Sequence, residues 1–416
     1  MRAWSLSVGL ACAIVGGGNC LAQESSRHGT PFADATQYEL PEHATRASIP
    51  CRVASNQVTF DCVVNETPDV HLVLDSGMPI PGVLLFTSPH VDEAGLTLSE
   101  DTVMVGGAGD ANAAATARIG SAARVAMGEL TMRDVPVLLM ERPKGFPKNV
   151  DGIVGGALFF RFAVRIDMSA STIDVIEPTA FEPAAGASVL PLRRAGGFVF
   201  VRAALTIDDR DPVDAELVVD LGANQALSIY AHNAAGIQVP ARSIETVVGR
   251  GLLSPIRGMI GRVRSIRLGD FTVDGVVASF LNPEHAHAGD SNATDGNLGA
   301  GLLKRFVVTF DHAASRIVLE RGPEFDEPFE YDMSGLAFDL AYGGERAVIA
   351  VVAGSPAARA GIEVGDVVVA IDGTPIGDFT EFAWREKLRV DGAHVTLRMR
   401  RGDESRDVEL VLERQV

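Results

Sequence analysis

The sequence of 416 residues predicts a mainly β protein with two similar lobes and a smaller C-terminal domain. Three observations carry this prediction. Landmarks recur at a nearly constant offset through the first three quarters of the chain, which indicates a duplicated unit. Short apolar runs separated by glycine-containing turns recur in both copies and are typical of strands. After about residue 330 the pattern changes, which indicates a further domain.

The N-terminal 22 residues have the features of an export signal. Arg2 supplies a positive charge, and residues 3–18 are mostly apolar but form too short a run to span a bilayer comfortably. Small residues occupy the cleavage-specifying positions of Cys20-Leu21-Ala22. We therefore expect a signal peptide over 1–22, cleaved after Ala22, and a periplasmic or secreted protein without stable membrane insertion. Residues 23–45 are polar and form a linker or a pro-segment.

The charge balance argues against one class of partner. The chain has 36 Lys and Arg against 54 Asp and Glu, a formal net charge of −18. Nucleic-acid binding depends on clustered basic residues, so we expect no nucleic-acid partner. The excess of acidic side chains is explained most simply by solubility.

Two cysteines remain once the signal peptide is removed, Cys51 and Cys62. An isolated pair this close in sequence, in an oxidising compartment, favours a disulfide. We therefore predict that Cys51 and Cys62 are bonded to each other.

The internal repeat places an aspartate at the same point of each copy, and about 145 residues separate the two. Asp75 stands in Val73-Leu74-Asp75-Ser76-Gly77, and Asp220 stands in Val218-Val219-Asp220-Leu221-Gly222. Further along, Asp151-Gly152-Ile153-Val154-Gly155 corresponds to Asp295-Gly296-Asn297-Leu298-Gly299. We expect lobe 1 over 46–182 and lobe 2 over 183–322.

Each of these two aspartates follows a run that resembles a buried strand, residues 70–74 in copy one and 216–219 in copy two. The glycine two positions after each aspartate permits a tight turn that aims the carboxylate outward. A carboxylate buried without partners would be costly, so Asp75 and Asp220 are unlike ordinary turn residues.

The duplicated motifs resemble the pepsin and retropepsin superfamily of aspartic proteases over residues 46–322. The resemblance implies two pseudo-symmetric, retropepsin-like β-barrel lobes in a monomer. It also implies a catalytic pair, Asp75 and Asp220, in loops formed with Ser76, Gly77 and Gly222. Ser76 matches the hydroxyl residue that ties the two loops together in this family. Copy two departs from the pattern, because Leu221 cannot make that hydrogen bond.

Two neighbouring carboxyls suit peptide hydrolysis because they cannot both ionise and so share a proton. The charged member accepts a proton from water, and the protonated member donates to the scissile carbonyl. The expected substrates are peptides or unfolded proteins.

Glycine-rich segments lie between the aspartate and the second motif of each copy. Val105-Gly106-Gly107-Ala108-Gly109 and Val248-Gly249-Arg250-Gly251 hold matching places. The resemblance implies flaps here, with Gly106, Gly107, Gly249 and Gly251 as flap residues. Neither segment has the tyrosine found in the flap of pepsins, which favours a retropepsin-like cleft with two flaps.

The C-terminal region, 328–416, resembles a PDZ domain. Gly335-Leu336-Ala337-Phe338 is similar to the carboxylate-binding loop of that family, and residues 355–366 are similar to its bacterial signature. Residues 380–388 are expected to form the helix beside the peptide groove. The resemblance implies a C-terminal peptide ligand, held by loop amides and added as a strand.

Other motifs predict little. His285, His287 and Asp290 lie in a polar loop, and we expect no metal and no cofactor. Two functions stay open: an exported aspartic endopeptidase whose PDZ domain recruits substrates or regulates activity, and a non-catalytic peptide-binding protein on the same scaffold. Ser76 and the two aspartates favour the enzyme, and Leu221 favours the binding protein.

Overall fold

The computed structural model describes most of the chain from residue 36 onward, together with two short N-terminal strands. The described residues are 13–16, 19–20, 36–106, 114–143, 146, 149–195, 197–230, 236–250, 255–281, 294–338, 346–379 and 383–416.

The N-terminal half contains strands and two one-turn helices. These are β1 (Ala13–Gly16), β2 (Asn19–Cys20), β3 (Gln37–Glu39), β4 (Arg46–Pro50), β5 (Arg52–Ala54), β6 (Gln57–Val64), β7 (Thr67–Leu74), β8 (Val83–Phe86), α1 (Pro89–Asp92), β9 (Leu98–Gly106), β10 (Ala114–Met127), β11 (Leu130–Met140), β12 (Gly152–Val154), α2 (Gly156–Phe159), β13 (Ala163–Asp167) and β14 (Thr172–Ile176). Strand β1 pairs with β9 at one edge of the sheet.

The next part of the chain repeats this series. It contains β15 (Ser188–Pro191), β16 (Arg193–Ala195), β17 (Phe198–Thr206), β18 (Val213–Asp220), β19 (Leu227–Tyr230), β20 (Ser243–Arg250), β21 (Pro255–Leu268), β22 (Phe271–Leu281), β23 (Gly296–Gly299), α3 (Ala300–Leu303), β24 (Phe306–Asp311) and β25 (Arg316–Arg321).

The two lobes share one strand order. Lobe 1 has the path β9-β10-β11-β8-β12-β7-β6-β5, and lobe 2 has β20-β21-β22-β19-β23-β18-β17-β16. The correspondence holds strand for strand, including the parallel pairs β12–β7 and β23–β18. The sequence pattern explains the folding of each strand: in β6, Val58, Phe60, Cys62 and Val64 alternate inward. The expected mainly β architecture with two pseudo-symmetric lobes is confirmed.

A third sheet joins the lobes, with the order β15-β25-β24-β13-β14-β4. At its centre β13 and β24 pair antiparallel, with Val164 opposite Phe310. One hydrophobic core runs through both lobes beneath this sheet, and Phe159 contacts Phe310 edge to face with ring centroids 4.9 Å apart. The lobes are therefore held together by a continuous core as well as by the chain.

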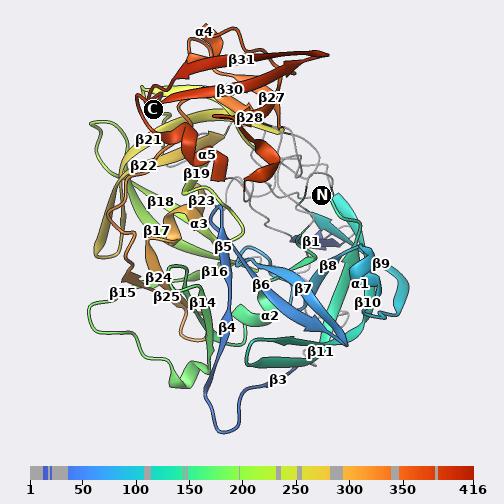
Figure 1. Ribbon diagram of the computed structural model, residues 1–416. Helices are drawn as coiled ribbons and strands as arrows, with labels where there is room; N and C mark the ends of the chain where they lie inside the picture. Colours follow the sequence, from blue (N-terminus) through green and yellow to red (C-terminus); the bar gives the residue numbers. More distant parts are fainter. Residues whose placement is uncertain are drawn as a thin grey trace.

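The C-terminal domain has its own sheet and core. Its elements are β26 (Leu336–Phe338), β27 (Arg346–Val351), α4 (Pro356–Arg359), β28 (Val367–Ile371), β29 (Thr374–Pro375), α5 (Ala383–Glu386), β30 (His394–Arg401) and β31 (Glu404–Val411). The sheet order is β26-β27-β28-β30-β31, and Trp384 is buried in the core of this domain. Figure 1 shows this domain, in orange and red, above β21 and β22 of lobe 2.

The end of the chain is bound to lobe 2. The side chain of Val416 is buried with Val248 and Ile256. Arg262 donates hydrogen bonds to the carbonyl oxygen of Phe329 and to a main-chain oxygen of Val416, at 3.0 and 3.3 Å. These contacts fasten both ends of the C-terminal domain to the hairpin β20–β21.

The predicted disulfide between Cys51 and Cys62 is wrong: both cysteines are free and buried. The strand register explains the difference. Arg52 faces Thr59 across β5 and β6, whereas Cys62 lies opposite Val70 of β7. The sulfur of Cys62 contacts the Val70 carbonyl at 3.2 Å instead of a second sulfur.

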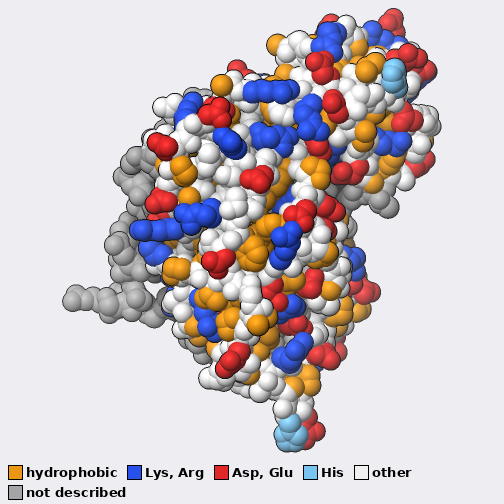
Figure 2. All heavy atoms as spheres, turned by 90° about the vertical axis from the view of Figure 1, so that its left-hand side faces the viewer, with side chains coloured by type: hydrophobic (Ala, Val, Ile, Leu, Met, Phe, Trp, Pro, Cys, Tyr) orange, Lys and Arg blue, Asp and Glu red, His pale blue; other side chains and the backbone are white. Residues whose placement is uncertain are grey.

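Two surface properties bear on partners. Basic and acidic side chains are interspersed on the face shown in Figure 2, so that face presents no single-sign basic patch. Among the described residues, no helix is both long and apolar enough to cross a membrane.

Candidate active site

Parallel strand pairs bring Asp75 and Asp220 to matching positions. Strand β12 pairs with β7, and the Asp75 amide donates to the Val154 carbonyl at 3.0 Å. In lobe 2, β23 pairs with β18 so that Asp220 lies opposite Gly299. The second motif of each copy is therefore the strand that supports the aspartate loop.

The support requires a glycine directly after β12. A Cβ on Gly155 would lie 2.2 Å from the Asp75 carbonyl oxygen and 2.4 Å from that of Met78. No side chain fits at that distance, which explains the glycine that follows the apolar pair.

Asp75 and Asp220 meet in the interior. Both carboxyls adjoin Gly77, and the two residues are 0% and 1% exposed. A Cβ on Gly77 would lie 2.8 Å from Asp220 Oδ1 and 3.1 Å from Asp75 Oδ1. The loop glycine thus leaves the space into which both carboxyls converge.

Backbone amides hold the two carboxyls in place. The Gly77 amide donates to Asp75 Oδ1 at 2.7 Å. The nearby Gly222 amide opposes the rise in pKa of both carboxyls that burial causes. Two oxygens, Asp75 Oδ2 and Asp220 Oδ1, are buried without a donor among the described groups. A proton shared between the carboxyls supplies that donor.

The pKa shifts of the two carboxyls also favour a shared proton. Burial raises the pKa of Asp75 well above its usual value, and the negative charge of Asp220 raises it further. Burial also raises the pKa of Asp220, while amide donors oppose the rise. Two neighbouring carboxyls buried away from water resist double ionisation. The pair therefore retains one proton at pH values well above the usual range of carboxyl pKa values.

Ser76 bridges the two loops. Its hydroxyl donates to the Val219 carbonyl at 2.9 Å and accepts from the Leu221 amide at 3.0 Å. Leu221 is fully buried in the core and makes no reciprocal hydroxyl bond. The bridge is therefore made from lobe 1 alone.

Asn297 is a site residue that the motif analysis missed. It is 7% exposed, and its Nδ2 donates to Asp220 Oδ2 at 3.0 Å. The available indication was its position: Asn297 corresponds to Ile153, and a polar residue in a buried apolar strand needs a partner. The partner is the aspartate.

The flap residues are described in part. Gly106 ends β9 opposite Ala114 of β10, and Gly249 lies in β20 opposite Ile256 of β21. Each lobe thus has a hairpin at the predicted place. Gly107 and Gly251 lie outside the described residues, as do His285, His287 and Asp290.

The turn that leads into the predicted carboxylate-binding loop holds a carboxylate of this chain, and Gly335 is the loop residue that bonds to it. Asp332 Oδ1 accepts from the amides of Ser334 and Gly335, at 2.9 and 3.0 Å, and from the Ser334 hydroxyl at 2.5 Å. The Leu336 amide donates to the Ser334 hydroxyl. Ala337 and Phe338 continue into β26, which pairs with β27. Within the described residues, no group of three or more His, Cys, Asp and Glu forms a metal site.

Two family models match parts of this chain. Residues 60–158 match the family model described as aspartyl protease, and residues 348–401 match a PDZ domain model. The solved structure of an aspartic proteinase from Irpex lacteus is similar, with 12% identity and a TM-score of 0.45, over 68% of this chain and 98% of that chain. No curated protein matches the chain. The resemblance to an aspartic protease with a C-terminal PDZ domain is confirmed by the two family models.

Proposed function

We propose that this chain, which carries an aspartyl protease match and a PDZ domain, is an aspartic endopeptidase. The observation that supports the proposal most directly is the burial of Asp75 and Asp220 beside the same glycine, Gly77, with one oxygen of each carboxyl lacking a donor among the described groups. A pair with a single proton contains both a base and an acid, which amide hydrolysis needs at once.

The proposed reaction starts from a water molecule between the two carboxyls. The ionised carboxyl removes a proton from the water, whose oxygen attacks the scissile carbonyl carbon. The protonated carboxyl donates its proton to the carbonyl oxygen, and a neutral tetrahedral diol forms. The carboxyl that took the water proton passes it to the amide nitrogen, while the other carboxylate takes a proton from a diol hydroxyl. The C–N bond breaks, an amine and a carboxylic acid are released, and the pair again holds one proton.

The surrounding residues have supporting roles in this proposal. Gly77 and Gly222 give amide hydrogens to the carboxyls, and Ser76 fixes the distance between the two loops. The hairpins β9–β10 and β20–β21 act as flaps over a peptide substrate. The PDZ domain binds peptides, through a free C-terminus, for recruitment or regulation. We also propose that the protein is exported and acts as a monomer.

The test is a peptide-library digest with purified protein from acid to neutral pH. We expect cleavage by the wild-type protein and none by Asp75→Asn or Asp220→Asn, because asparagine cannot exchange the shared proton. Asp167→Asn is the matched control, since Asp167 caps an exposed turn by accepting from the Ala170 amide. Equal cleavage by Asp220→Asn would refute the mechanism. Peptide binding without any cleavage would favour the non-catalytic alternative.

A further inference from the structure

Two short segments that flank the C-terminal domain lie together on lobe 2. Residues 329–331 lead into the domain and residues 414–416 follow it, and an ion pair joins them, with 2.6 Å between Glu330 Oε1 and Arg414 Nη2. Arg262 of β21 donates to a main-chain oxygen in each segment, as described above. We call these two segments together the clasp.

The clasp is fixed to the hairpin β20–β21 by polar and apolar contacts. Arg242, which directly precedes β20, donates to the main-chain carbonyls of Arg414 and Gln415, at 2.7 and 3.2 Å. The side chain of Val416 is 5% exposed and packs with Val248 of β20 and Ile256 of β21. Two arginines and one buried apolar side chain therefore hold the clasp against the hairpin.

The apolar cluster that receives Val416 has a counterpart in lobe 1. In lobe 2 its members include Tyr230, Val248, Ile256, Ile260 and Leu281. Strand for strand, these correspond to Phe86, Val105, Ala115, Ile119 and Met140, which pack together in lobe 1. The lobe 1 cluster adds Phe146 of the same lobe, with ring centroids of Phe86 and Phe146 4.8 Å apart. Lobe 2 instead adds Val416 and Tyr331 of the clasp. The packing of the lobe 2 hairpin therefore includes side chains from outside its own lobe.

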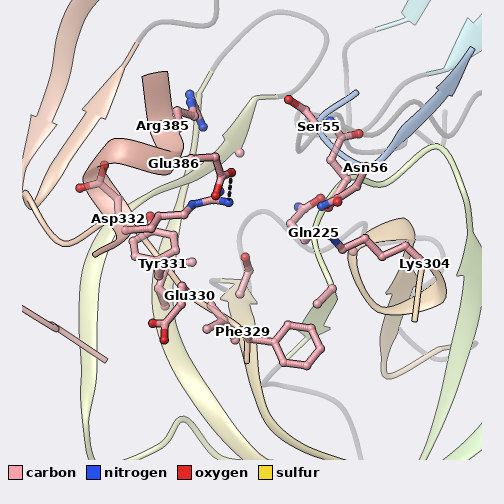
Figure 3. Close-up of a pocket in the computed structure, with 18 of the residues that line it drawn as sticks. Ser55, Asn56, Gln225, Lys304, Phe329, Glu330, Tyr331, Asp332, Arg385 and Glu386 are labelled. Atoms are coloured by element: carbon pink, nitrogen blue, oxygen red, sulfur yellow. Dashed lines mark hydrogen bonds and ion pairs between the residues drawn. The ribbon is translucent and has the colours of Figure 1, made fainter. Parts of the chain in front are cut away.

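The clasp is also where movement of the C-terminal domain would reach the lobes. The core of this domain, within residues 333–412, is separate from the core of the lobes. A cavity of about 830 Å³ lies between them, and Figure 3 shows Glu330 and Tyr331 on one side of it and Ser55 and Asn56 of lobe 1 on the other. Strand β27 of the domain lies beside β20. Domains without a shared core are expected to move relative to each other.

We propose that the clasp controls the lobe 2 hairpin: docked, it keeps β20–β21 ordered, and its release loosens that hairpin while β9–β10 of lobe 1 is unaffected. In the proposed function β20–β21 is the flap on the Asp220 side, so the C-terminal domain sets how readily this side of the cleft closes on a peptide. This second step rests on the proposed function, whereas the effect on the hairpin does not. The coupling is reciprocal, so a peptide that orders the hairpin also strengthens docking of the clasp.

The test is amide hydrogen exchange in the full-length protein, followed separately in β20–β21 and in β9–β10. Val416→Asp places a carboxylate in the apolar cluster, and we expect it to speed exchange in β20–β21 about tenfold. Arg242→Ala removes two hydrogen bonds without disturbing that cluster, and we expect an increase of about 2–5-fold. Val411→Asp, at an exposed position of β31, is the matched control and leaves both hairpins unchanged.

The location of the change decides the proposal. Unchanged exchange in β20–β21 in both variants overturns it. Equal increases in β20–β21 and in β24 of the joining sheet also overturn it, because the clasp would then support the whole lobe. Peptide cleavage by the same variants is measured separately, and a raised KM with kcat retained supports control of the cleft. An unchanged KM beside a loosened hairpin overturns that second step. A protein that cleaves no peptide but shows the hairpin effect refutes only the proposed function.

Discussion

Asn297 donates a hydrogen bond to Asp220, whereas the corresponding residue in lobe 1 is Ile153, whose side chain has no donor. The two halves of the carboxyl pair therefore differ in their surroundings although the backbone around them is repeated. The Asn297 bond lowers the pKa of Asp220 and so favours the ionised form of that carboxyl.

The first prediction concerns Asn297→Ile, which copies lobe 1 into lobe 2. Loss of a donor to a charged group raises the pKa of Asp220, and the acidic limb of the pH–activity profile should move up by about one pH unit. Ile153→Val, at the corresponding position, should leave the limb in place. An unchanged limb in Asn297→Ile would mean that the hydrogen bond does not stabilise the ionised pair. The measurement is kcat/KM against pH.

The second prediction concerns the bridge between the loops. Ser76→Ala leaves the Val219 carbonyl and the Leu221 amide buried without partners, so it should lower the free energy of unfolding by about 1–3 kcal/mol. Ser76→Thr keeps the hydroxyl and is the control. Leu221→Thr should leave cleavage intact or raise it, because it can add a second bridging hydroxyl. Urea titration and peptide cleavage measure the two effects, and greater loss in Ser76→Thr than in Ser76→Ala would contradict the assignment.

The third prediction concerns the glycine after β12. Gly155→Ala should destabilise the fold by about 3 kcal/mol, because the new Cβ would meet the Asp75 carbonyl at 2.2 Å. Gly120→Ala is the control, since its nearest neighbours would lie at 3.5 Å, an ordinary contact. Thermal unfolding of both variants is the measurement. A loss of stability in Gly155→Ala alone indicates a specific steric conflict, and equal losses in both variants indicate a general intolerance to substitution.

The fourth prediction concerns acid stability. His312 is buried, both ring nitrogens lack partners among the described groups, and burial lowers its pKa from 6.5 to about 4. The unfolded chain therefore takes up this proton first as the pH falls. Above pH 6.5, His312 is neutral in both the folded and the unfolded chain and does not lower the free energy of unfolding. Below pH 6.5 the free energy of unfolding falls progressively, down to about pH 4.

Substitution of His312 by Leu should remove this loss. Between pH 7.5 and 4.5, the free energy of unfolding should fall by about 2 kcal/mol less in His312→Leu than in the wild-type protein. His43→Leu, at an exposed histidine, should behave like the wild type. Equal losses in all three proteins would show that His312 is protonated at no cost in the folded state.

The fifth prediction concerns the cysteines. Burial raises the pKa of the Cys51 thiol to about 11 and that of Cys62 further, so almost no thiolate forms near pH 7. Iodoacetamide should modify neither cysteine in the folded protein and both after unfolding in urea. Mass spectrometry of protein from an oxidising compartment should find two thiols, and a loss of two hydrogens would instead indicate the bond that the fold lacks.

The repeat predicted the architecture because it is a long-range property of the sequence. Constant offsets between motifs imply the same strand order in both copies, and the structure has this order, with Asp75 and Asp220 both beside Gly77. The catalytic role of the pair stays a prediction. Ser76 was predicted to tie the loops together, and it contacts the opposite loop.

Other features depended on geometry that the sequence pattern does not contain. Cys51 and Cys62 are close in sequence, but strand register separates their partners. Asp332 lies outside the expected loop motif, and only the turn at Ser334 and Gly335 brings its carboxylate to the loop amides. The cavity combines segments more than a hundred residues apart, which local patterns do not reveal.

The antiparallel pairing of β13 with β24 joins two copies that one gene encodes. In a homodimer every substitution near the twofold axis occurs twice, so a change helpful on one side is also imposed on the other. A second asparagine at position 153 would favour ionisation of both carboxyls, and a second leucine at position 76 would remove the bridging hydroxyl altogether. Two copies in one chain are free of that constraint, which allows Asp220 to have Asn297 as a neighbour while Asp75 has Ile153 at the corresponding position.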